Sequence, residues 1–417
     1  MCLDGLGGCR LRPERRVTLT RPERAALASR GTGMWPVIIT CGLAIGLGAG
    51  PGFLFGFVGP ALQDELGISR AGLGLLIGLF FGFTGLASLL AARVGARFGA
   101  RRCVALNMIT VAVGGTAAAL GGSYPVLVLV AVTGGVAYAF GNVGTNLAVM
   151  AVARPGAGGF ALTLKTAGVP VIASLLALGG GWVDTVGWRA VAWSLAVAGC
   201  LAAAAVLVML PRTGGSSVTA RPEPPLRPGF RALPLAAFLF ICGSQPLQSW
   251  LVTYVHDEVG LPLTQAGPLT AAGTVLALGG MLGAARWADR LGARRRAVFV
   301  ALICLSTAAG VVALLAGARW WPPLVAAGAV LGLAANLAGS GLTHAVVVDR
   351  APESVGRASG VTMAGYYTGA LVAPWGFGAV ADATDGYEAS WAMCVVLLLL
   401  AAVAYWWTHR TLPVRSG

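Results

Sequence analysis

Two short stretches of this chain, RVGARFGARR at residues 93–102 and RWADRLGARR at residues 286–295, are identical at six of ten positions. The similarity extends upstream without a gap, so that residues 66–102 align with residues 259–295. The same alignment places Asp64-Glu65 on Asp257-Glu258. A repeat of this kind indicates two related halves, each built from the same structural unit.

The composition is that of a membrane protein. Of the 417 residues 57% are hydrophobic and 11% are charged, whereas soluble domains have about 25% charged residues. Apolar stretches of roughly 20 residues are long enough to cross a bilayer as helices. We expect an all-α protein with twelve such spans, at residues 36–59, 71–92, 103–120, 126–153, 159–181, 188–210, 234–255, 266–287, 297–316, 322–348, 357–381 and 389–408.

These spans predict two six-helix bundles, at residues 35–210 and 234–408, in parallel orientation. A linker rich in Pro, Gly, Ser and Arg joins them at residues 211–233 and is expected to be flexible. The tails at residues 1–34 and 409–417 are predicted to lie outside the bundles. The first tail lacks the apolar core of a signal peptide, and we expect it to be disordered or, if translation begins at Met34, absent.

The distribution of the arginines indicates the orientation in the membrane. The formal net charge is +14, but the arginines gather in the tails, the linker and alternate loops, and only Arg70, Arg189 and Arg319 fall on the other side. The loops on that other side are instead acidic, as at Asp64-Glu65 and Asp257-Glu258. This asymmetry follows the positive-inside rule. We therefore expect both termini in the cytoplasm, and the charge requires no nucleic acid partner.

The eight cysteines show no spacing typical of metal ligands. Most lie within or at the ends of apolar runs, where a free cysteine behaves as a small hydrophobic residue. We expect no disulfide, no metal and no cofactor. The chain also lacks a combination of nucleophile, base and orienting residue, so an enzyme is not predicted.

The repeated loop resembles the signature G-x-x-x-D-R-x-G-R-R of the major facilitator superfamily. The second copy keeps the aspartate, whereas the first has Ala96 in its place. The resemblance implies two parallel halves with a substrate site between them, lined by helices 1, 4, 7 and 10 with help from 2, 5, 8 and 11. It also implies a cytoplasmic gate, although the arginines could serve only to set the topology. The gate residues would be Arg97, Gly99, Arg101, Asp289, Arg290, Gly292 and Arg294.

Lys165 is the only lysine of the chain and the only charged residue well inside a predicted span. A charge in the middle of a membrane helix costs about 2.5 to 3.5 kcal/mol on insertion scales and is by default a functional residue. The alternative is that its long stem reaches the cytoplasmic headgroups. With no carboxylate predicted near it, we expect Lys165 to attract an anionic substrate.

Polar residues on four other predicted spans could complete a site. They recur at helical spacing, as Asn142 and Asn146 do on the fourth span. Each could instead connect helices by hydrogen bonds. His344 is a candidate for carrying a coupled proton, and the alternative is a plain hydrogen-bonding role. The substrate-binding candidates besides Lys165 are Asn142, Asn146, Gln245, Asn336, Ser340, Thr362 and Tyr366.

The pattern K-x-x-G-V-P at residues 165–170, followed by GWR at 187–189, resembles bacterial permeases of the cyanate and monocarboxylate type. Taken together, the sequence predicts a monomeric secondary transporter of the bacterial inner membrane that moves a small anion or organic acid by alternating access. Drug efflux is the main alternative. A non-transporting membrane sensor is a remote one, because it would normally need an appended soluble domain.

Overall fold

The computed structural model describes residues 33–154, 158–211 and 224–411, and every regular element within these ranges is a helix. The residues outside these ranges include most of each predicted tail and about half of the predicted linker. The helices form two groups along the chain, in agreement with the two predicted halves.

The first half contains six long helical segments, which coincide with the first six predicted spans. A break at Ala167 divides the fifth span into α7 and α8, which the sequence did not predict. Two short helices, α3 (Gly59–Leu66) and α9 (Val183–Val186), lie in the loops. The long segments are α2 (Met34–Phe57), α4 (Arg70–Phe98), α5 (Ala100–Gly121), α6 (Tyr124–Val152), α7 (Gly158–Thr166) with α8 (Gly168–Gly180), and α10 (Trp188–Met209).

The second half begins with a 3-10 turn, η1 (Pro228–Arg231), and has the same plan. Its first span is broken at Trp250, and its second and third spans form one 57-residue helix whose backbone leaves the helical conformation at Gly292. The elements are α11 (Ala232–Ser249) with α12 (Leu251–Asp257), α13 (Leu263–Arg319), α14 (Pro323–Arg350), α15 (Val355–Thr384) and α16 (Glu388–Thr411).

Ten helices of the described chain are long and apolar enough to cross a membrane. One of them is α13, which contains two predicted spans on either side of Gly292. The 30-residue α15 is not among the ten, but it is long enough to span. The predicted fold of twelve spanning segments is confirmed.

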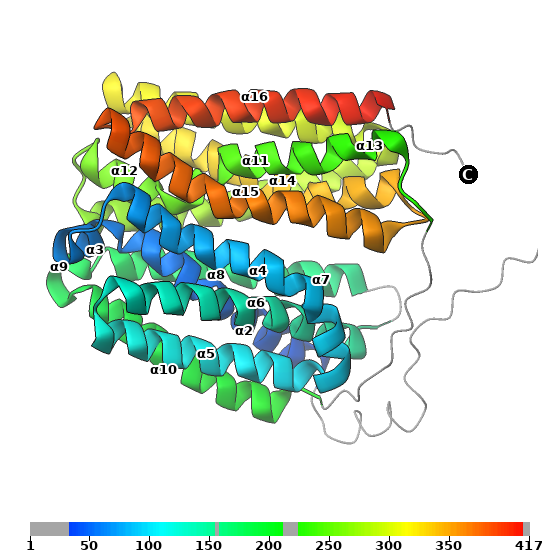
Figure 1. Ribbon diagram of the computed structural model, residues 1–417, viewed down its shortest axis with the longest axis horizontal. Helices are drawn as coiled ribbons and strands as arrows, with labels where there is room; N and C mark the ends of the chain where they lie inside the picture. The colour runs from blue at the N-terminus through cyan, green and yellow to red at the C-terminus, as the bar shows by residue number, and fades with distance from the viewer. Residues whose placement is uncertain (1–32, 155–157, 212–223, 412–417) are drawn as a thin grey trace, which may run out of the picture.

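The two halves lie side by side with their long helices roughly aligned (Figure 1). We call the end where α2 begins and α16 ends the terminal end, and the opposite end, with α3, α9 and the α12–α13 connection, the loop end. The halves meet along α4 against α15 and along α8 against α13. These contacts run from the loop end to about the middle of the helices, where Ser174 on α8 donates to the carbonyl of Ala271 on α13 at 3.4 Å.

Glycines at equivalent positions of the repeat share an unusual backbone conformation. Gly67 and Gly260 have φ of 62° and 73°, and Gly99 and Gly292 have φ of 78° and 72°. The last two also have ψ of 164° and 172°, a combination essentially restricted to glycine. Gly99 and Gly292 therefore make the sharp connection between the second and third helices of each half. This structural role is independent of the gate role predicted for them.

Replacing Gly292 with alanine should destabilise the protein by about 1–3 kcal/mol, because a Cβ disfavours this backbone conformation. Thermal unfolding of the purified protein in detergent would measure the effect. Gly279→Ala is the matched control, since Gly279 lies on the same helix and a Cβ there would have no atom within 4 Å. Equal stability of the two variants would contradict the prediction.

The three arginines on the acidic side each pair with an acid at the loop end. Arg189 lies 2.5 Å from Glu65, Arg319 3.2 Å from Glu388, and Arg70 3.8 Å from Asp385. Burial alone would raise the pKa of Glu65, but hydrogen bonds from Arg189 and Trp188 hold it below its usual value. These arginines are thus local partners of carboxylates, which explains their position among acidic loops.

Candidate functional site

Lys165 lies at the next-to-last position of α7, and its side chain is only 2% exposed. Its ammonium group donates hydrogen bonds to Asn146 Oδ1 at 2.8 Å, Asn142 Oδ1 at 3.0 Å and Thr145 Oγ1 at 3.2 Å. All three acceptors belong to α6, where their spacing places them on one face. The ammonium group therefore lies inside the helix bundle rather than at its surface.

The three bonds match the chemistry of a charged lysine. An ammonium has three donors and no acceptor. The hydroxyl of Thr145 donates a hydrogen bond to the carbonyl of Asn142 at 2.9 Å, so its oxygen is free to accept from Lys165. Within the described chain, Lys165 forms no ion pair with a carboxylate. Lys165 is thus a buried cation surrounded by neutral oxygens. Thr145 was not among the predicted site residues, although it follows the same spacing as the asparagines.

Small residues allow α2 to approach α8, which follows α7 in the same broken span. A Cβ on Gly168 would overlap the carbonyl of Gly42, and one on Gly46 would overlap the carbonyl of Gly168. Such direct backbone contact is typical of small residues in membrane helix pairs. Gly168, the glycine of the K-x-x-G-V-P pattern, therefore allows α8 to pack in direct backbone contact with α2.

In the second half, three predicted residues lie together. Tyr366 on α15 donates to Ser340 Oγ on α14 at 3.3 Å. One turn further along α14, His344 is exposed and its Nδ1 lies 3.1 Å from the carbonyl of Ser340. The cluster therefore places the hydroxyl groups of Tyr366 and Ser340 close to the imidazole of His344.

Three other predicted residues are buried and have polar atoms without a hydrogen-bond partner in the described structure. They are Nε2 of Gln245, Oδ1 of Asn336 and Oγ1 of Thr362, whose residues are at most 4% exposed. A buried polar atom without a partner costs about 1–3 kcal/mol. Such atoms are therefore candidates for contact with a bound molecule.

Tyr138 lies one turn before Asn142 on α6, the helix that accepts the hydrogen bonds of Lys165. Its ring packs on Phe80 with centroids 5.7 Å apart. Phe80 lies on α4, which contacts both α6 and α15, so α4 lies between the helix that accepts from Lys165 and the helix that carries Tyr366.

The residues predicted for a cytoplasmic gate lie at the terminal end. Asp289 lies 3.4 Å from Arg296, which binds Asp349 on α14 at 2.6 Å, and all three belong to the second half. The backbone carbonyl of Arg294 accepts from Arg350 at 3.2 Å. In the first half the guanidinium of Arg97 lies 5.7 Å from the ring centroid of Phe98. In this structure these contacts stay within each half.

Among the described residues, no group of three or more His, Cys, Asp or Glu side chains could hold a metal ion. The polar residues described above can donate and accept hydrogen bonds and provide one fixed positive charge. This arrangement is suited to binding a solute.

The model of the Major Facilitator Superfamily matches residues 34–317 and 285–417. No curated protein matches the chain. Among solved structures, a bacterial homolog of the human lysosomal transporter Spinster, inward-facing and unoccupied, is similar with a TM-score of 0.77 and 17% identity over 94% of this chain and 98% of that chain. The xylose transporter XylE from E. coli, in an inward-open conformation, gives 0.75 and 14% over 92% and 97%. A D-xylose-proton symporter gives 0.70 and 15% over 89% and 97%.

Proposed function

Because the chain belongs to the Major Facilitator Superfamily, we propose that it is a secondary active transporter that moves a small anion, such as an organic acid, by alternating access. The observation that carries the choice of an anion is Lys165, a buried cation with three neutral hydrogen-bond acceptors. A buried charge is usually paired with an opposite charge. Here the substrate would supply that opposite charge.

Binding would proceed by exchange of acceptors. All three donors of Lys165 are occupied, so a carboxylate oxygen would replace one or both asparagine oxygens, and each released asparagine amide could then donate to the anion through its NH₂ group. A charge-assisted bond is roughly twice as strong as a neutral one. Gln245 Nε2 and Thr362 Oγ1 offer two further donors that have no partner in the described structure.

The contacts between the halves support a closed loop end in this conformation, with the substrate path leading to the terminal end. We propose that the terminal end faces the cytoplasm of a bacterial cell, as the arginine distribution predicts, and that the protein is a permease of the cyanate or monocarboxylate type. The exposed imidazole of His344, one turn from Ser340, is the candidate for a coupled proton.

Uptake into proteoliposomes containing the purified protein tests the proposal. A panel of poorly permeant monocarboxylates and dicarboxylates would be compared with a neutral sugar and a cationic amphiphile, with and without a pH gradient, and protein-free liposomes would correct for passive permeation. We expect uptake of at least one small anion above the protein-free background. Transport of only the sugar or only the amphiphile would overturn the anion proposal and, in the second case, favour drug efflux.

A further inference from the structure

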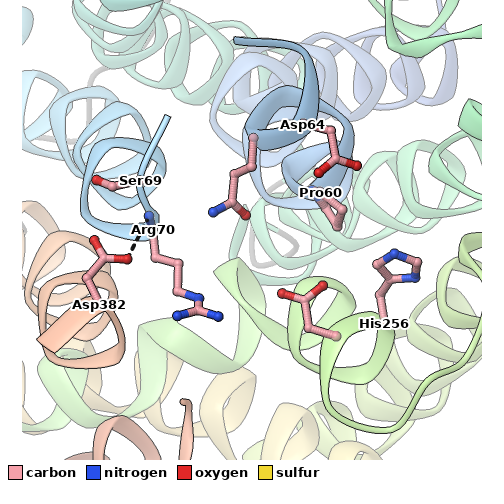
Figure 2. A pocket seen from close by; sticks show the side chains of 8 residues that line it. Pro60, Asp64, Ser69, Arg70, His256 and Asp382 are labelled. Carbon is pink, nitrogen blue, oxygen red and sulfur yellow. Dashed lines mark hydrogen bonds between the residues drawn. The ribbon is translucent and has the colours of Figure 1, made fainter. Parts of the chain in front are cut away.

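At the loop end, the first turn of α4 is capped by a residue of the other half. Asp382, near the end of α15, accepts hydrogen bonds from the backbone N–H groups of Arg70 at 3.1 Å and Ala71 at 2.8 Å, and Figure 2 shows its carboxylate directed at the start of α4. The N–H groups at the start of a helix have no partner within the helix, and the helix dipole favours a negative charge there. The side chain of Ser69 accepts from the next N–H, that of Gly72.

The side chain of Arg70 also binds the second half. Its Nε donates to the hydroxyl of Tyr387 at 3.3 Å, and its Nη1 donates to the carbonyl of Ala381 at 3.3 Å. The guanidinium lies 4.9 Å from the centroid of the Tyr387 ring, and the Tyr387 hydroxyl donates to Asp257 at 2.6 Å. Backbone and side chain of one residue of the first half are therefore both held by the second half.

These contacts border a pocket of about 250 Å³ between the halves (Figure 2). Solvent can therefore reach the polar contacts, which can exchange their partners for water when they break. The pocket is lined by Pro60, Gln63, Asp64, Ser69 and Arg70 of the first half and by His256, Asp257 and Asp382 of the second.

Glycines hold α4 and α15 at the distance that these bonds require. A Cβ on Gly74 would overlap the carbonyl of Pro374, and one on Gly378 would overlap the carbonyl of Arg70. When the loop end opens, α4 and α15 must separate here, and both the cap and the Arg70 contacts are lost. These hydrogen bonds therefore exist only while the loop end is closed.

We infer that Asp382 and Arg70 form a latch that holds the loop end closed, at the end of the molecule opposite the arginine loops predicted as a gate. The inference rests on the proposed alternating access. It does not depend on the chemical class of the substrate, and its test measures opening of the loop end without any substrate.

The test uses Thr253→Cys as a reporter in the full-length protein in lipid nanodiscs. Thr253 is fully buried at the loop end, and its hydroxyl has no hydrogen-bond partner in the described structure, so the substitution removes no bond. The rate at which the introduced thiol reacts with a membrane-impermeant maleimide, followed by mass spectrometry of its peptide, reports opening. Chymotrypsin cleaves after aromatic residues such as Trp250 and so separates residue 253 from Cys242, and the native cysteines can therefore stay.

Adding Asp382→Asn to the reporter should raise the labelling rate about tenfold, as expected when charge-assisted hydrogen bonds are lost from the closed state alone. Arg70→Gln, which keeps the backbone N–H but removes the guanidinium, should also raise the labelling rate. Asp385→Asn is the matched control, because Asp385 is fully exposed and its carboxylate lies 3.8 Å from Arg70, and it should change the rate less than twofold.

An unchanged rate in both Asp382→Asn and Arg70→Gln would overturn the latch. An equal increase in Asp385→Asn would overturn it as well, because the effect would then be one of surface charge. Circular dichroism and thermal unfolding of each variant would identify a protein that labels because it has unfolded. Failure of the anion proposal would appear only in the uptake experiment and would leave these rates unaffected.

Discussion

Replacing Lys165 with methionine should lower anion uptake by at least about 30-fold, since removing one partner of a buried charge pair costs about 2 kcal/mol or more. Methionine keeps the length and much of the volume of the lysine stem but provides neither charge nor donors. The oxygens of Asn142, Thr145 and Asn146 would lose their common donor, and the substrate would lose its opposite charge. The measurement is the initial rate of uptake in proteoliposomes for the anion found with the wild-type protein.

Two further variants separate charge from geometry. Lys165→Arg keeps the charge, but its planar fork does not reproduce the three bonds of an ammonium, so its uptake should lie between that of the wild type and that of the methionine variant. Thr166→Val is the matched neighbour: Thr166 is exposed and its hydroxyl donates to the carbonyl of Leu162 on its own helix, at 2.9 Å. It should transport like the wild type. Anion uptake by Lys165→Met at the wild-type rate would reject the role of the charge.

Replacing Gly168 with alanine should have the second large effect. The new Cβ would overlap the carbonyl of Gly42, so α2 and α8 would have to separate, and overpacking of this kind typically costs about 1–3 kcal/mol. The shift would also move Lys165 relative to its acceptors on α6. We expect a lower unfolding temperature together with reduced uptake.

The matched control for this variant is Gly360→Ala. Gly360 also lies on a spanning helix, α15, but a Cβ there would have no atom within 4 Å. Alanine has a higher helix propensity than glycine, so the variant should be as stable as the wild type or slightly more stable. A Gly168→Ala protein with wild-type stability and uptake would show that the contact between α2 and α8 can relax.

Most of the fold could be predicted from the sequence because each spanning helix corresponds to one continuous apolar stretch. The repeat added the relation between the halves, and the structure confirms it in the paired backbone conformations of Gly99 and Gly292. The breaks at Ala167 and Trp250 were not predicted. They are small departures from helical geometry within apolar stretches, and hydropathy does not detect them.

The sequence predicted several residues of the candidate site but not the hydrogen bonds between them. Helical spacing identified Asn142 and Asn146, but we expected them to orient the substrate, whereas in the structure both accept from Lys165. That contact depends on how α7 packs on α6, and the residue spacing within either helix does not predict this packing. Whether the asparagines also contact a substrate stays a prediction.

The loop-end contacts were missed for a related reason. Arg70 and Tyr387 meet although they are 317 positions apart in the sequence, and Tyr387 is 130 positions from Asp257. One signal was available. Arg70 is one of three arginines that depart from the charge asymmetry, and a charge on the unexpected side of a membrane protein indicates a local partner of opposite sign.

The neutral surroundings of Lys165 also determine how the membrane potential acts on transport. With three uncharged acceptors the empty site carries one positive charge, and with a monovalent anion bound it carries none. A potential of about 100 mV changes the energy of one charge that crosses it by about 2.3 kcal/mol. For an anion carried without a proton on His344, voltage therefore acts mainly on the return of the empty carrier, and the loaded carrier changes its access without electrical work.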